Sequence, residues 1–235
     1  MFKTKAMLAG TLLAGLASAA HSAEFTVEVT NLTNGLYFTP LLVVAHNSNA
    51  DVFEVGQPAS APLQQVAEGG ALTLFEQALT PAVGVTSNNP ANGLLAPGES
   101  TSAMLNTDNT DFNLLSIAAM MLPSNDAFVG LDSWEIPTEA GTYTLTVVGY
   151  DAGTEANDEI QGSGVSGEPG FPAPPPVAAT SGTGGTGVPG VTAEGFVHVH
   201  RGVLGDLDLN GGVSDIDAAV HRWLNPVARI TVTVQ

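Results

Sequence analysis

Two acidic stretches of the chain carry the side chains best suited to bind a cation. Residues 121–132 read MLPSNDAFVGLD, and residues 149–159 read GYDAGTEANDE. Each acidic group follows an apolar stretch typical of a β-strand, so the carboxylates are expected to gather at one tip of a β-sandwich. A hard cation with oxygen ligands would neutralise their repulsion there. Asp151 and Glu155 flank Gly153, which allows the chain to fold back so that both face one ion. The alternative is a pair of solvated acidic turns without metal.

A second acidic loop, residues 206–217, reads DLDLNGGVSDID. Oxygen-bearing side chains stand at loop positions 1, 3, 5 and 12, and Gly211 stands at position 6, as in an EF-hand loop. This spacing predicts a second calcium site, formed by Asp206, Asp208, Asn210 and Asp217. The helix-like segment 218–224 follows, as in a dockerin-type repeat, but no entering helix precedes the loop and only one copy exists. A dockerin-like calcium-dependent assembly module is therefore an alternative, and so are acidic turns that arise by chance.

His198 and His200 alternate on a predicted strand, so both imidazoles project from the same face. An H-x-H pair can ligate zinc or iron, with His46, His221 or an acidic residue as the third ligand. A metal-dependent enzyme that uses His198 and His200 is thus one alternative, and a polar strand face with hydrogen-bonded imidazoles is the favoured interpretation. The sequence contains no G-x-S-x-G elbow, no H-E-x-x-H motif, no P-loop and no dinucleotide fingerprint. We therefore expect a protein that is not an enzyme.

The elements that position these residues are mainly strands. Alternation of apolar and polar residues, or continuous apolar runs, predicts strands over Glu24–Thr30, Leu36–His46, Glu99–Asn106, Leu114–Leu122, Phe128–Ile136, Gly141–Tyr150, Phe196–His200 and Ala228–Val234. Two short helices are expected over residues 62–67 and 71–79. Residues 88–98 predict a turn-rich loop, and residues 162–190 predict a long Pro/Gly-rich surface loop. Seven to nine strands with only short helices favour an all-β antiparallel sandwich.

Composition excludes several classes of function. The 235 residues contain no cysteine, which excludes a disulfide framework, a thiolate zinc site and a thiol nucleophile. The net charge is −18, and binding to nucleic acid or to an anionic membrane needs clustered Lys and Arg. Aromatic residues make up only 6% of the chain, which argues against base-stacking or sugar-stacking platforms.

Residues 1–23 resemble a Sec-type signal peptide, with a basic start, a short apolar run and small residues before the cleavage point. The apolar run is shorter than the ~20 residues that a membrane span needs, so we expect cleavage and a secreted or periplasmic protein. Cleavage removes both lysines, and the three remaining arginines against 23 acidic residues leave a net charge of −20. Such a surface suits salty water or bound divalent cations, and the alternative is that the charge serves solubility alone.

The two acidic stretches also carry a family resemblance. Residues 123–130 read PSNDAFVG and residues 151–155 read DAGTE, in that order. They are similar to the Pro-Ser-x-Asp-x-x-Val-Gly and Asp-Ala-Gly-Thr-Asp/Glu stretches of the spondin domain, the N-terminal module of F-spondin that also occurs in exported bacterial proteins. The opening strand and the closing VARITVTV are similar too, so the resemblance spans residues 24–235, which we expect to form one domain.

The resemblance implies a C2-like antiparallel β-sandwich that binds calcium and takes part in extracellular adhesion. Carried over by position, the family's metal ligands fall on Asp126, Asp151 and Glu155. Three features depart from the family: the chain lacks cysteines, Ala127 stands where an aromatic residue is usual, and the third acid is Glu rather than Asp. The expected protein is a secreted calcium-binding adhesion or interaction module whose partner is an unknown extracellular or cell-surface ligand.

Overall fold

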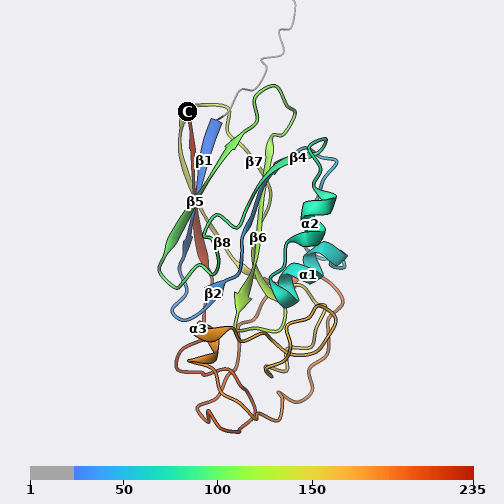
Figure 1. Cartoon of the computed structure of the whole chain (residues 1–235), viewed down its shortest axis with the longest axis vertical. Coiled ribbons are helices and arrows are strands. Elements are labelled where there is room, and N and C mark those ends of the chain that lie inside the picture. Colours follow the sequence, from blue (N-terminus) through green and yellow to red (C-terminus); the bar gives the residue numbers. More distant parts are fainter. Residues whose placement is uncertain (1–23) are drawn as a thin grey trace, which may run out of the picture.

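The computed structural model describes residues 24–235, and the expected signal peptide, residues 1–23, lies outside the described residues. Two antiparallel sheets form a sandwich, with irregular segments gathered at one end of it (Figure 1). This confirms the all-β sandwich predicted from the sequence. No helix within residues 24–235 is long and apolar enough to cross a membrane.

The smaller sheet has four strands in the order β5-β1-β11-β8. They are β1 (Glu24–Asn31), β5 (Ser100–Asn106), β8 (Gly141–Val147) and β11 (Ala228–Val234). In β1, Phe25, Val27 and Val29 are fully buried while Thr26 and Glu28 are partly exposed, because alternate side chains of a strand point to opposite faces. β11 pairs with β1 over residues 228–234 and with β8 on its other edge. The last strand of the chain is therefore central to this sheet.

The larger sheet has the order β10-β9-β7-β6-β3-β4, and β2 pairs with β6 beside that path. Its strands are β2 (Tyr37–Phe38), β3 (Leu42–His46), β4 (Gly84–Asn88), β6 (Leu114–Leu122), β7 (Ala127–Glu135), β9 (Gly149–Asp151) and β10 (His198–Val199). β6 is buried along almost its whole length because both faces of this sheet are covered.

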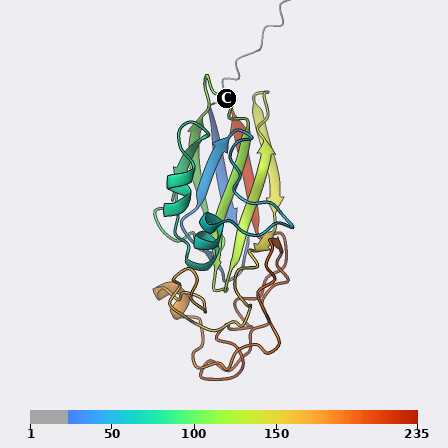
Figure 2. The same ribbon diagram turned by 90° about the vertical axis from the view of Figure 1, so that its right-hand side faces the viewer.

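Two short helices cover the outer face of the larger sheet (Figure 2). α1 (Ala61–Gly69) begins at Ser60, whose hydroxyl accepts a hydrogen bond from the N–H of Leu63, and it ends at Gly70 in the left-handed conformation. α2 (Thr73–Ala78) follows. Apolar side chains of both helices join a core cluster with β3, β6 and β7, and the main core lies between the two sheets. A third helix, α3 (Pro175–Ala178), interrupts the Pro/Gly-rich loop.

The strand predictions hold with three differences. Within residues 24–235 there are eleven strands rather than seven to nine, partly because Pro40 separates β2 from β3 and Val148 separates β8 from β9. β4 was not expected, since Gly84–Asn88 shows no apolar alternation. Residues 218–220 form a turn and residues 221–224 are irregular, so the helix expected after the second acidic loop is wrong.

Acidic side chains hold the irregular segments against the sandwich. Glu68, which is buried at the end of α1, accepts hydrogen bonds from Ser166 Oγ at 3.0 Å and from the N–H of Gly167 at 2.6 Å. Glu159 accepts three, from the N–H of Leu204 (2.6 Å), the N–H of Gly205 (2.8 Å) and Ser214 Oγ (2.7 Å). Backbone donors that lack a sheet partner are satisfied in this way, which allows the irregular segments to pack.

We predict that Glu68→Gln weakens the attachment of the Pro/Gly-rich loop by about 1–3 kcal/mol, because hydrogen bonds to a charged acceptor are stronger and the amide replaces one of the two acceptor oxygens with a donor. Hydrogen exchange over residues 163–170 should become faster, while exchange in β6 stays unchanged. Glu76→Gln, on the exposed face of α2, is the matched control. Equal protection of residues 163–170 in both variants would show that Glu68 does not hold the loop.

Candidate metal centre

Two buried carboxylates meet where β7 and β9 lie side by side. Asp126 directly precedes β7, and Asp151 ends β9 and pairs in register with Ala127. Asp126 is 0% exposed and Asp151 is 1% exposed. Ion pairs of residues 24–235 involve only histidines as cations, so neither carboxylate is paired with Lys or Arg in the described chain. The structure thus brings the two predicted strand-end acids together without a fixed counter-charge.

Asp126 is held by the turn that follows β9. Its Oδ2 accepts hydrogen bonds from the N–H groups of Thr154 (2.8 Å) and Glu155 (3.0 Å). Its Oδ1 is buried and has no hydrogen-bond partner. Burial, followed by the charge of Asp151, raises the pKa of Asp126 well above its usual value, and the two backbone N–H groups oppose this rise. The site would therefore gain from a cation that replaces the proton.

Both carboxylate oxygens of Asp151 accept hydrogen bonds from residues nearby in the sequence. Oδ1 accepts from the N–H of Gly153 at 2.8 Å, and Oδ2 accepts from Asn157 Nδ2 at 2.7 Å. Burial raises the pKa of this carboxyl, while these two donors lower it. Gly153 has a φ of +68°, and a Cβ there would lie 2.4 Å from the carbonyl oxygen of Phe196. This close approach brings the segment before β10 against the acidic turn.

Glu155 lies in the same turn, but its side chain is directed elsewhere. Its N–H donates to Asp126, whereas its Oε1 accepts from Asn125 Nδ2 at 2.8 Å and from the N–H of Gly170. Its Oε2 is buried without a hydrogen-bond partner, and burial raises the pKa of the carboxyl. A cavity of about 410 Å³ lies beside it, lined in part by Glu68, Asp158 and Glu168. Glu155 is therefore next to the carboxylate pair, with one oxygen free for a ligand.

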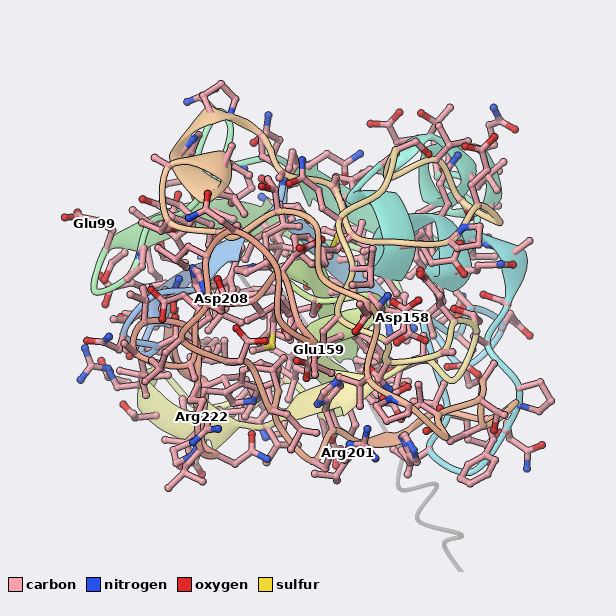
Figure 3. All side chains as sticks on the ribbon, turned by 90° about the horizontal axis from the view of Figure 1, so that it is seen from below. Glu99, Asp158, Glu159, Arg201, Asp208 and Arg222 are labelled. Carbon is pink, nitrogen blue, oxygen red and sulfur yellow. The ribbon has the colours of Figure 1, made fainter. Side chains whose placement is uncertain are left out.

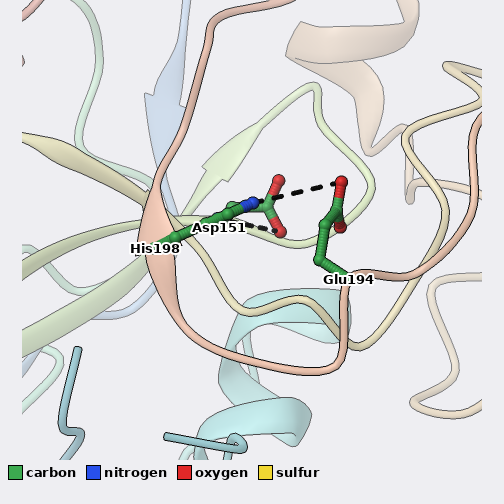
Figure 4. A group of neighbouring side chains, drawn as sticks. All are labelled: Asp151, Glu194 and His198. Carbon is green, nitrogen blue, oxygen red and sulfur yellow. Dashed lines mark ion pairs between the residues drawn. The ribbon is translucent and has the colours of Figure 1, made fainter. Parts of the chain in front are cut away.

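Within the described residues, Asp151, Glu194 and His198 form a group of potential metal ligands (Figure 4). One ligand atom from each lies within 4.8 Å of the other two. His198 Nδ1 is 3.9 Å from Asp151 Oδ1, and His198 Nε2 is 4.0 Å from Glu194 Oε1. Of the predicted pair His198 and His200, this group contains His198 and not His200. Glu194 was not predicted, because it lies in an irregular segment and no pattern links it to Asp151.

His200 lies close to Asp151 Oδ2, at 3.5 Å, but its ring is already hydrogen-bonded. Its Nδ1 accepts from the N–H of Gly202 at 2.9 Å, and its Nε2 is 3.1 Å from Asn157 Oδ1. Burial, followed by the charges of Arg201 and His198, lowers its pKa to about 3. His46 and His221 bond elsewhere, to Ser116 and Thr180 respectively. Only His198 of the predicted pair therefore keeps a ring nitrogen without a hydrogen bond.

The second acidic loop lies at the surface of the end of the sandwich where the irregular segments gather, which we call the loop end. Figure 3 views the molecule from this end and labels Asp208. The backbones of Asp206 and Asp217 pair in an isolated β-bridge, which joins the two ends of the loop. The carboxylates accept backbone N–H groups of the loop itself: Asp206 from residues 208, 213 and 214, Asp208 from residue 210, and Asp217 from residue 219. The three N–H groups that donate to Asp206, first that of Ser214, lower the pKa of its carboxyl. Asp208 and Asn210 are exposed, and calcium binding by this loop stays a prediction.

The burial of His200 predicts a pH dependence of stability. The unfolded chain protonates this imidazole below about pH 6.5, whereas the folded chain does so only near pH 3. Between these values the unfolded state binds more protons, so the contribution of His200 to stability is lost as the pH falls through that window, by about 1.4 kcal/mol per pH unit. Denaturant unfolding should show a smaller decline in His200→Gln than in the unchanged protein. His198→Gln, on the same strand and partly exposed, is the control, and an equal decline in all three proteins would contradict the assignment.

Comparison with known proteins supports the resemblance seen in the acidic stretches. No curated protein matches the chain. The Spondin_N family model matches residues 16–169, which include β1 to β9 and all three carboxylates of the predicted calcium site. The match covers well over half of the chain and ends before Glu194 and His198. With the sandwich fold and the two motifs in place, we conclude that this chain belongs to the Spondin_N family.

Proposed function

We propose that this protein is a secreted calcium-binding adhesion or interaction module without enzymatic activity. Calcium would be held by Asp126, Asp151 and Glu155 at the tip formed by β7, β9 and the turn after β9. One observation carries the proposal: Asp126 Oδ1 and Glu155 Oε2 are buried carboxylate oxygens without any hydrogen-bond partner in the described chain. Membership of a family of extracellular modules supports export and an interaction role.

The argument for a cation is energetic. A buried ionised carboxylate without a partner costs several kcal/mol, so it binds either a proton or a cation. Near pH 7 a proton is scarce, and the described residues offer no Lys or Arg here. The available donors on Asp126, Asp151 and Glu155 are all oxygens, which is the ligand set that calcium prefers. The four carboxylates around the neighbouring cavity would also attract a divalent ion.

Calcium at this tip would order the loops that surround it. Asp126 already holds the turn of Thr154 and Glu155, and Glu155 in turn accepts from Gly170 of the Pro/Gly-rich loop. An ion between these carboxylates would fix both segments as one surface for an extracellular or cell-surface partner. A partner that is a nucleic acid is excluded by charge, since only Arg201, Arg222 and Arg229 remain in residues 24–235. Residues 24–235 would form one domain after removal of the signal peptide at residues 1–23.

The two alternatives have weaker support. A metal-dependent enzyme using His198 and His200 would need two available ring nitrogens, and His200 has both of its nitrogens within hydrogen-bond reach of other groups. A dockerin-like module would need the helix after Asp217, and residues 218–224 are not helical. The loop of Asp206, Asp208, Asn210 and Asp217 is retained as a proposed weaker calcium site.

We predict that calcium stabilises the folded protein by about 2.7 kcal/mol at a concentration 100 times its Kd, because it binds the folded state alone. Thermal melts should show a higher Tm with calcium and a lower one after chelation. Asp126→Asn keeps the size of the side chain and removes its charge, so it should abolish the tighter calcium event in calorimetry.

Asp208→Asn is the matched variant in the second acidic loop and should affect a weaker event or none. If Asp208→Asn removes the tight event while Asp126→Asn keeps it, calcium binds at the surface loop and the site ranking is wrong. An unchanged melt after demonstrated removal of metal would contradict a structural role for calcium.

A further inference from the structure

We propose that Asp151, Glu194 and His198 form a separate site for a zinc-class divalent metal at the edge of the larger sheet. Two of its three residues lie beyond the part of the chain that the family model matches. The site shares Asp151 with the proposed calcium tip but needs neither Asp126 nor Glu155.

The donor set distinguishes this site from a calcium site. It offers one imidazole nitrogen and two carboxylate oxygens, and nitrogen donors suit zinc, copper or nickel while calcium takes oxygen. Three protein ligands with a fourth position open to water are a common arrangement around zinc. His198 and Glu194 keep 30% and 29% of their side-chain surface exposed, so an ion can enter and a water molecule can complete its coordination.

The distances fit a set of ligands that are close but not bonded to each other. His198 Nδ1 lies 3.9 Å from Asp151 Oδ1, and His198 Nε2 lies 4.0 Å from Glu194 Oε1. Both distances are too long for hydrogen bonds. The two distances belong to different nitrogens of the ring, since Nδ1 is the atom near Asp151 and Nε2 the atom near Glu194. With one donor atom from each residue, the three atoms lie within 4.8 Å of one another. Tetrahedral zinc with ligands at 2.0–2.1 Å needs donor atoms about 3.3 Å apart, so side-chain movements of about 1.5 Å would close the set. His198 Nδ1 is buried and has no hydrogen-bond partner, which leaves this nitrogen free to bind a metal.

The backbone holds the three residues in place. His198 and Asp151 are direct partners in the β9–β10 ladder. The rings of Phe196 and His198 pack nearly perpendicular to each other, with centroids 5.2 Å apart and planes at 77°. The N–H of Gly195, next to Glu194, donates to the carbonyl of Gly153 at 2.8 Å, which ties this segment to the acidic turn. Figure 4 shows the carboxylates of Asp151 and Glu194 on the same side of the imidazole. The site is therefore preorganised by main-chain contacts.

The test is titration of zinc into metal-free protein that carries no histidine tag, followed by calorimetry. His198→Gln and Glu194→Gln should each weaken zinc binding by about tenfold or more, since each removes a ligand. Asp126→Asn removes a charge beside Asp151 but no zinc ligand, so it should abolish calcium binding while zinc binding persists, weakened less than in either ligand variant. Glu99→Gln, an exposed acid at a distant turn, is the control for loss of one negative charge. Cobalt in place of zinc should give an absorption band that His198→Gln eliminates.

These outcomes separate the two proposals. Zinc binding that depends on His198 and Glu194 and persists in Asp126→Asn supports the site, whether or not calcium binds. Zinc affinity that is unchanged in His198→Gln, or reduced equally by Glu99→Gln, would overturn it and indicate non-specific attraction to an acidic surface. Loss of calcium binding in Asp126→Asn with no zinc event in the unchanged protein would support the calcium proposal and reject this one.

Discussion

The hydrogen bond from a backbone N–H to a buried carboxylate is the interaction on which the loop end of this protein depends. Glu68, Asp126, Asp151, Glu159 and Asp215 are all buried, and each accepts at least one main-chain donor. The long segment between β9 and β11 contains only α3 and the two-residue strand β10, so its N–H groups have few sheet partners. Carboxylates supply the missing acceptors, and charged acceptors make stronger hydrogen bonds than neutral ones.

This solution leaves negative charge in a poorly solvated region. The three arginines of the described chain do not compensate for it, since none forms an ion pair with these acids. Figure 3 places Arg201 and Arg222 along one side of the loop end, while Asp158 and Glu159 lie nearer its centre. Burial accordingly raises the pKa of Asp126, Asp151 and Glu155. A bound divalent cation would both satisfy the free oxygens and link the loops, so metal binding and loop order follow from the same constraint.

The sandwich gives these acids a rigid base. β11 lies between β1 and β8 in the smaller sheet, and Asp126, directly before β7, lies next to the end of β9. The aromatic rings of Phe53, Phe128 and Tyr150 pack together on the outer face of the larger sheet, with centroids 5.0–5.5 Å apart. The family match ends at residue 169, yet β10 and β11 pair with matched strands. The final third of the chain is thus built onto the sandwich rather than separate from it.

The sequence predicts the sandwich well because burial follows simple patterns in its strands. Phe25, Val27 and Val29 alternate with polar residues, and the apolar run of β6 is buried on both faces. The same reasoning misses β4, because its residues show no apolar alternation. β4 forms by pairing with β3 at the edge of the larger sheet. It predicts the meeting of Asp126 and Asp151 at a strand end, but not Glu194, which only the chain path after the Pro/Gly-rich loop brings near. Loop carboxylates that accept backbone donors leave no periodic signal at all.

The central claim is that a calcium ion compensates the buried carboxylates at the tip of the sandwich. Anomalous diffraction from crystals grown with calcium tests it most directly, because the ion is located without reference to any variant. The account predicts a strong peak coordinated by Asp126, Asp151 and Glu155, with the Glu155 side chain turned toward it. Calcium-saturated crystals with no peak there, or with their only peak in the loop of residues 206–217, would contradict it.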